Sequence, residues 1–117
     1  MSLSRNQTKS HFCAGTILNS RWILTAAHCF TFIKTLDEFI VQYNSTYLES
    51  NKSQFSSALR VIKHEGYNPT ITIHDIALIK LKEPIDVQVI QLPYKINSYE
   101  NVTATLLGWG LNAVMPC

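Results

Sequence analysis

The sequence predicts an all-β fold, either a barrel or a sandwich. Its apolar residues come in short runs of four to eight, rich in β-branched and aromatic types, with polar or turn-forming residues between them. Sustained helical periodicity is absent, and Ala26–Cys29 offers at most one helical turn. At 117 residues, 46% of them hydrophobic and 15% charged, the chain is one domain or a piece of a larger one, and it is not intrinsically disordered.

Seven segments fit the strand pattern. They are Ser2–Arg5, His11–Leu18, Trp22–Thr25, Phe39–Tyr43, Ser56–His64, Ile76–Leu81 and Val102–Gly108. Asn19–Arg21 can form a tight turn between the second and third strands, and Glu65–Pro69 is a loop by composition. Pro84 ends the sixth strand because it cannot donate a ladder hydrogen bond.

A long connection separates the last predicted strand from the other six. Between Pro84 and Glu100 the alternation is lost, and a single strand then follows, ending in Gly108-Trp109-Gly110. We therefore expect three parts: a first β-barrel over residues 1–83, an inter-barrel connection over residues 84–100, and the truncated start of a second barrel over residues 101–117.

Charge and hydropathy argue against several kinds of partner. The formal net charge of +2 is too small to indicate binding to nucleic acid or to an anionic membrane. No apolar run approaches the roughly 18 residues that a transmembrane helix needs. The N-terminal stretch MSLSRNQTKSHF lacks the apolar segment of a signal peptide. We expect neither a nucleic acid nor a membrane as a partner.

Four Asn-x-Ser/Thr acceptors nevertheless favour a secretory route. Of the eight asparagines, the four that open such a motif are Asn6, Asn44, Asn51 and Asn101. With 20 Ser and Thr among 117 residues, chance alone would give about 1.4. We therefore predict a secreted glycoprotein, while loops that are simply rich in Asn, Ser and Thr remain the alternative.

The cysteines and a neighbouring histidine allow two interpretations. The candidate ligands for a zinc site are His11, Cys13, His28 and Cys29. Their spacing matches none of the usual ligand pairs, so we expect no metal and no cofactor. A disulfide fits better, because a hairpin would bring Cys13 and Cys29 together, and the bridge would contribute about 3 kcal/mol. Cys117 is then left unpaired within this chain.

An acidic residue directly before an apolar strand is the second candidate for chemistry. In the segment HDIALIKL, alternation places Asp75 on the same side as Ala77 and Ile79. A carboxylate on that side is costly unless a partner such as an imidazole N–H accepts its charge. The alternative is that Asp75 only caps the strand in water.

Three blocks together resemble the chymotrypsin/trypsin-like serine proteases. HFCAGTILNSRWILTAAHCF is similar to that family's sequence around its catalytic histidine, HDIALIKL to the strand after its catalytic aspartate, and LLGWG to the start of its second barrel. The blocks stand in the family's order. The resemblance implies that the chain forms the first of two six-stranded antiparallel barrels, with Ser2 and Leu3 in its opening strand. It also implies that the full-length form is secreted and cleaves proteins or peptides.

Carried over residue by residue, the resemblance assigns three roles. His28 matches the general base, Asp75 matches the acid that orients it, and Cys13 with Cys29 matches the disulfide beside the histidine. The nucleophile has no counterpart, because no Gly-Asp-Ser-Gly-Gly occurs and nothing local marks any of the ten serines as activated. The family's Ile-Val-Gly-Gly activation terminus and specificity pocket are also missing.

Two functions remain open from the sequence. The first is an N-terminal fragment of a secreted serine endopeptidase, which is inactive alone and needs the missing second barrel as its structural partner. The second is a non-catalytic homologue that acts as a binding or decoy module. The presence of both His28 and Asp75 favours the first.

Overall fold

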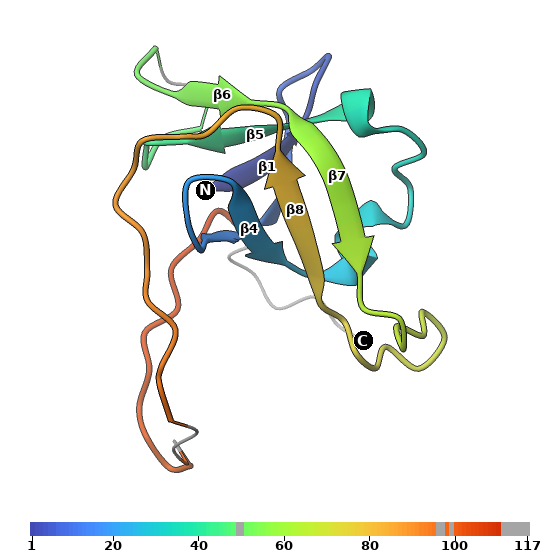
Figure 1. Cartoon of the computed structure of the whole chain (residues 1–117), viewed down its shortest axis with the longest axis vertical. Coiled ribbons are helices and arrows are strands. Elements are labelled where there is room, and N and C mark those ends of the chain that lie inside the picture. The colour runs from blue at the N-terminus through green and yellow to red at the C-terminus, as the bar shows by residue number, and fades with distance from the viewer. Residues whose placement is uncertain (49–50, 96–97, 99, 111–117) are drawn as a thin grey trace.

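Alternating apolar side chains organise the chain into two antiparallel sheets (Figure 1). The computed structural model describes residues 1–48, 51–95, 98 and 100–110. One sheet has the order β2-β1-β5-β6, formed by β1 (Ser2–Arg5), β2 (His11–Ala14), β5 (Phe39–Tyr43) and β6 (Gln54–Ser56). The other has the order β3-β4-β8-β7, formed by β3 (Thr16–Ile17), β4 (Trp22–Thr25), β7 (Ala58–Lys63) and β8 (Ala77–Leu81).

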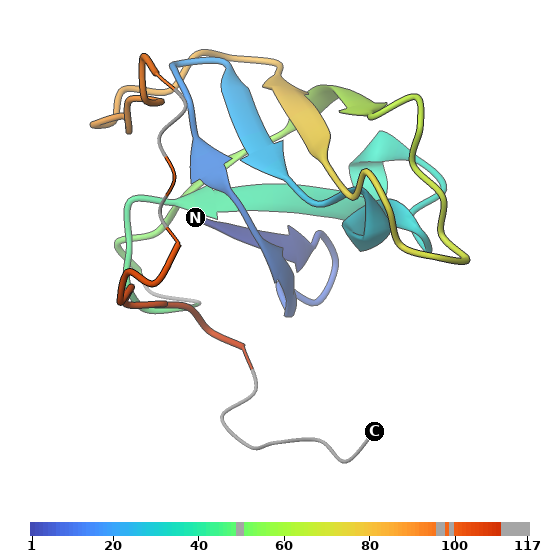
Figure 2. The ribbon, with the colours of Figure 1, turned by 90° about the horizontal axis from the view of Figure 1, so that it is seen from below.

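The two sheets close into one barrel because two long strands pass from one sheet to the other. β2 continues into β3 across Gly15, and β6 continues into β7 across Ser57. Pairing then runs in a closed circuit: β1 with β2, β3 with β4, β4 with β8, β8 with β7, β6 with β5, and β5 with β1. Counting each long strand once gives the six-stranded antiparallel barrel that the resemblance implied. Figures 1 and 2 show how its strands are arranged.

The core follows from the alternation predicted for the strands. On β8, Ala77, Ile79 and Leu81 are buried while Leu78 and Lys80 are only partly covered, as expected from the sequence. The fully buried side chains are contributed by strands on opposite sides of the barrel: Leu3, Ile23, Phe39, Val41, Ile79 and Leu81.

Two single-turn 3₁₀ helices lie in the connections. η1 (Ala27–Phe30) follows β4 at the place where one helical turn was expected. η2 (Leu36–Glu38) was not predicted, although its capping box is readable in the sequence: Thr35 and Glu38 bond reciprocally across the turn. Within the described part of the chain, no helix has the length and hydrophobicity needed to cross a membrane.

The predicted strand Val102–Gly108 is wrong. These residues are described, and they take part in no β-ladder. A strand exists only with a neighbour to pair with, and no strand of the described residues forms a ladder with this segment. Its apolar side chains are correspondingly open to solvent, with Val102 64%, Leu106 98% and Leu107 87% exposed.

Candidate active site

His28 is held at the rim of the barrel by the turn that ends β4. Its neighbours in η1, Ala27 and Phe30, are buried and anchor the turn in the core, while the His28 side chain is 57% exposed. The Thr31 hydroxyl and the Thr31 backbone N–H both donate to the His28 carbonyl, at 2.8 and 3.1 Å. The backbone is therefore fixed while the imidazole faces solvent.

Asp75 reaches His28 because β4 and β8 are paired. The register aligns Thr25 with Ala77, so the residues that follow β4 meet the residues that precede β8. Asp75 Oδ2 lies 2.6 Å from His28 Nδ1, and Asp75 Oδ1 accepts the His28 backbone N–H at 2.8 Å. The carboxylate thus accepts hydrogen bonds from both the side chain and the backbone of His28. The sequence left two alternatives for Asp75, an imidazole partner or a strand cap in water, and the structure shows the imidazole partner.

These two hydrogen bonds also affect the charge of Asp75. Hydrogen bonds from the His28 ring and from its backbone N–H lower the pKa of Asp75 below its ordinary value, so the carboxylate stays ionised. Because an ionised carboxylate only accepts hydrogen bonds, the proton of neutral His28 sits on Nδ1 and Nε2 holds the free lone pair. Nε2 is therefore the atom able to accept a proton from a substrate or a nucleophile.

A strained backbone helps to present Asp75. His74 has φ of 54°, in the left-handed region that non-glycine residues seldom adopt, and its carbonyl accepts the Ile76 N–H at 2.8 Å. The resulting tight turn around Asp75 aims its carboxylate back toward η1 just before β8 begins. This turn was not predicted from the sequence, although histidine is enriched among non-glycine residues in the left-handed region and aspartate is a common turn residue.

The Cys13–Cys29 disulfide ties β2 to η1 beside the histidine. The bond is present, as the resemblance implied, and its two Cα atoms lie 6.1 Å apart. It links the residue next to His28 to a strand on the other sheet of the barrel. Cys117, the predicted unpaired cysteine, lies outside the described residues.

A Ser–His contact that the sequence reasoning missed lies elsewhere in the barrel. Ser2 Oγ and His11 Nδ1 are 2.6 Å apart, and Ser2 Oγ also lies 3.1 Å from Ser4 Oγ. Burial lowers the pKa of His11. Ser2 is only 1% exposed, so no substrate could reach its hydroxyl, and the contact is structural. Pairing β1 with β2 in the observed register would have revealed it.

No described serine replaces the missing nucleophile at His28. Within the described residues, the atom recorded near His28 Nε2 is Cys29 Sγ, at 4.0 Å, and no hydroxyl hydrogen-bonds to that nitrogen. The candidate site therefore consists of a histidine and the carboxylate that is hydrogen-bonded to its Nδ1, with the His28 side chain 57% exposed.

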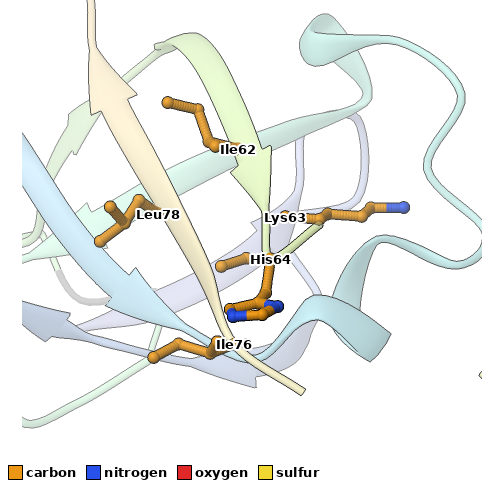
Figure 3. Close-up of a pocket in the computed structure, with 6 residues that line it drawn as sticks. Ile62, Lys63, His64, Ile76 and Leu78 are labelled. Atoms are coloured by element: carbon orange, nitrogen blue, oxygen red, sulfur yellow. The ribbon is translucent and has the colours of Figure 1, made fainter. Parts of the chain in front are cut away.

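A shallow apolar hollow lies on the outside of β7 and β8 (Figure 3). Its lining residues are Ile62, Lys63, His64, Ile76, Ala77 and Leu78. The His64 ring stacks on the His74 ring with centroids 4.6 Å apart, and His64 Nδ1 accepts the Gly66 N–H at 2.9 Å. These contacts brace the loop that carries Asp75.

The four predicted glycosylation acceptors differ in accessibility. Asn44, Asn51 and Asn101 are exposed. Asn6 is half-buried, its Nδ2 donates to the Asp37 carbonyl at 3.0 Å, and its Oδ1 accepts from Lys9 Nζ at 3.2 Å. The amide nitrogen that a glycan would modify is thus hydrogen-bonded in half-buried Asn6, and in exposed Asn44 it donates to Gln54 Oε1 at 3.4 Å.

Comparisons with known proteins identify the family of this chain. The sequence model of the family named Trypsin matches residues 1–114. Clotting factor C of Tachypleus tridentatus is 35% identical, over 86% of this chain and 12% of its own length. Anionic trypsin of Canis lupus familiaris is 35% identical and trypsin of Sus scrofa 33%, each over 86% of this chain and over 40% and 44% of the respective relative. The solved structure of human heparin binding protein superposes with a TM-score of 0.73 at 23% identity, covering 85% of this chain and 45% of the other.

The chain thus spans less than half the length of each of these proteins. The likeness to the solved structure supports the fold, and the family match extends over nearly all 117 residues. A match of this extent, on a barrel that pairs a histidine with an aspartate at its rim, means that the chain belongs to the trypsin family of serine proteases.

Proposed function

We propose that this chain is the part of a secreted serine endopeptidase that supplies the general base and its orienting acid. The observation that carries the proposal is the double hydrogen bond from His28 to Asp75, at 2.6 and 2.8 Å. A structural histidine does not need its free nitrogen turned outward and its other nitrogen fixed by a carboxylate. A general base needs both.

In this mechanism, His28 Nε2 takes the proton of a serine hydroxyl as that oxygen attacks the peptide carbonyl. The same nitrogen then returns the proton to the leaving amine. Asp75 holds the Nδ1 tautomer and stabilises the imidazolium that forms in between. The serine, the oxyanion hole and the specificity pocket would come from polypeptide beyond these 117 residues, which carry no Gly-Asp-Ser-Gly-Gly. Residues 1–83 would then form the first barrel, 84–100 the connection, and 101–117 the entry to a second barrel.

The first test is to read the transcript past Cys117. An in-frame Gly-Asp-Ser-Gly-Gly with a translated product that cleaves peptides would support the proposal. In that product, His28→Ala should lower kcat by roughly 10²–10⁴-fold, the range of general base catalysis. Asp75→Asn should also lower kcat, while Asp86→Asn, an exposed aspartate outside the site, should not. A stop codon directly after Cys117, with a stable secreted product, would refute it.

A chemical probe tests the 117-residue chain itself. A fluorophosphonate that labels activated serines should leave it unlabelled, because Ser2, the serine paired with a histidine, is 1% exposed. Labelling would contradict the account of the missing nucleophile. A trypsin of known activity, treated in parallel, controls for the reactivity of the probe.

Secretion and glycosylation form a separate part of the proposal. The Cys13–Cys29 bond and the exposed acceptors Asn44, Asn51 and Asn101 support it. Enzymatic removal of N-glycans from protein secreted by eukaryotic cells should shift its mass. Substituting Gln for these three asparagines should abolish that shift, whereas Asn6→Gln should leave it unchanged. A product without any glycan mass would contradict the proposal.

The second candidate is a non-catalytic homologue that binds a partner. It is favoured by the lack of any described hydroxyl hydrogen-bonded to His28 Nε2. The stop-codon outcome described above would support it, because a secreted chain with no nucleophile could act only by binding.

A further inference from the structure

Three potential metal-binding side chains meet at the rim of the barrel. One donor atom from each of Cys13, His28 and Cys29 lies within 4.8 Å of the other two. Cys29 Sγ is 4.0 Å from His28 Nε2, the nitrogen with the free lone pair. The fourth residue that the sequence offered as a ligand, His11, is not in this group, because its ring binds Ser2. The sequence spacing argued against zinc, but the fold brings three of the four candidates together.

The distances suit a tetrahedral metal ion. With metal–sulfur bonds of about 2.3 Å and metal–nitrogen bonds of about 2.05 Å, tetrahedral angles place sulfur about 3.6 Å from nitrogen and the two sulfurs about 3.8 Å apart. The present Sγ–Nε2 distance of 4.0 Å needs only a small side-chain rotation to reach the first value. Breaking the S–S bond would let the two sulfurs move apart to the second.

Asp75 gives His28 the second hydrogen bond that metal-binding histidines commonly make. A histidine that binds a metal through one nitrogen commonly donates its other N–H to a carboxylate, which fixes the ring and makes the ligand more basic. Asp75 holds His28 Nδ1 in this way at 2.6 Å. The His28 side chain is 57% exposed, so water could reach a fourth coordination position.

We propose that reduction of the Cys13–Cys29 disulfide converts this corner into a two-thiolate, one-imidazole site for a thiophilic divalent ion such as Zn²⁺. A dithiol reductant transfers two electrons and two protons to the S–S bond, yielding two cysteine thiols while the reductant closes its own disulfide. The metal then displaces the two thiol protons and takes the lone pair of His28 Nε2. With the disulfide intact, the sulfurs are bonded to each other and the site cannot form.

One consequence rests on the proposed function, while the site itself does not. A metal on Nε2 would occupy the nitrogen that serves as the general base. The reduced, metal-bound protein would therefore be unable to deprotonate a serine, even with the rest of the protease present.

The test is a cobalt titration of the 117-residue chain carrying Cys117→Ser, so that only two thiols remain. The protein is reduced with a dithiol, desalted under argon and titrated with Co²⁺. We expect thiolate-to-cobalt charge-transfer bands and the visible bands of a tetrahedral complex, saturating at one ion per chain and bleached by Zn²⁺. The oxidised protein should show none of these bands. No bands after reduction would overturn the proposal.

Three variants assign the imidazole. His28→Ala should weaken the site by more than the roughly 10–100-fold loss expected for Asp75→Asn, which removes only the partner that orients the ligand. Asp86→Asn, at an exposed residue outside the group, should bind as the parent does. Equal affinity in His28→Ala and the parent would overturn the proposal, since the thiols alone would then form the site.

The proposal can still be tested if the chain unfolds when the disulfide is reduced. Far-UV circular dichroism is recorded at each step. If the reduced chain unfolds, cobalt binding that restores the native spectrum in the parent, and not in His28→Ala, supports the site. Binding that leaves the chain unfolded, or that is indifferent to His28, overturns it.

Discussion

The strongest prediction concerns Phe39, because its side chain holds together the part of the core under the site. Phe39 is 1% exposed, and its ring meets Phe12 of β2 and Phe30 of η1 at centroid distances of 6.4 and 5.4 Å. In Phe39→Ala, the loss of roughly 100 Å² of buried apolar area costs about 2.5 kcal/mol. The neighbouring rings belong to elements fixed by the barrel and by the disulfide, so the cavity collapses poorly and the total reaches about 3–5 kcal/mol.

The assay is urea unfolding, followed by circular dichroism and by tryptophan fluorescence. The control is Phe32→Ala, the same substitution at a side chain that is 80% exposed, which should change the free energy of unfolding by less than about 0.5 kcal/mol. The slope against urea should be similar in both variants, so that the midpoints report stability. A loss below about 1 kcal/mol in Phe39→Ala, or one equal to that of Phe32→Ala, would refute the reasoning about the core.

Three further predictions concern the disulfide, a glycine and a half-buried histidine. Replacing Cys13 and Cys29 together by alanine should lower the free energy of unfolding by about 3 kcal/mol, since the bridge spans a sequence separation of 16; an unchanged Tm in calorimetry would contradict this. Gly15→Ala should cost about 1–3 kcal/mol, because its Cβ would lie 2.9 Å from the Leu24 carbonyl oxygen; a urea midpoint equal to the parent's would exclude that clash. Burial lowers the pKa of His11 in the folded state. As the pH falls, the unfolded chain therefore binds a proton at His11 before the folded chain does. Stability should therefore fall as the pH drops below about 6.5, and His11→Gln should flatten the slope; an equally steep slope in the variant would count against it.

Much of the barrel was predictable because its strands obey a simple period. On β8, the alternation that buries Ala77 and Ile79 is visible in the sequence and places Asp75 on the correct side. The ends of strands were harder to predict, because one continuous apolar run can contribute a strand to each of two sheets. His11–Leu18 reads as one strand, but the chain passes between sheets at Gly15.

Most of the failures involve relations that a local pattern does not encode, although the capping box of η2 was readable in the sequence. Val102–Gly108 has the composition of a strand, but composition does not supply a neighbour to pair with. The Ser2–His11 contact depends on the register between β1 and β2, and the turn around Asp75 depends on a left-handed His74. The roles of His28 and Asp75 came from family resemblance; the sequence alone could not place a carboxylate within 2.6 Å of a ring 47 residues away.

The closed circuit of strands constrains the distance between His28 and Asp75. In an open sheet, β8 could slip along β4 by two residues and keep the same face inward, which would move Asp75 about 7 Å relative to His28. In a closed barrel, such a slip must be matched by a change in the stagger of the whole ring, since every strand has two neighbours. The distance between His28 and Asp75 therefore depends on the stagger of all six strands together.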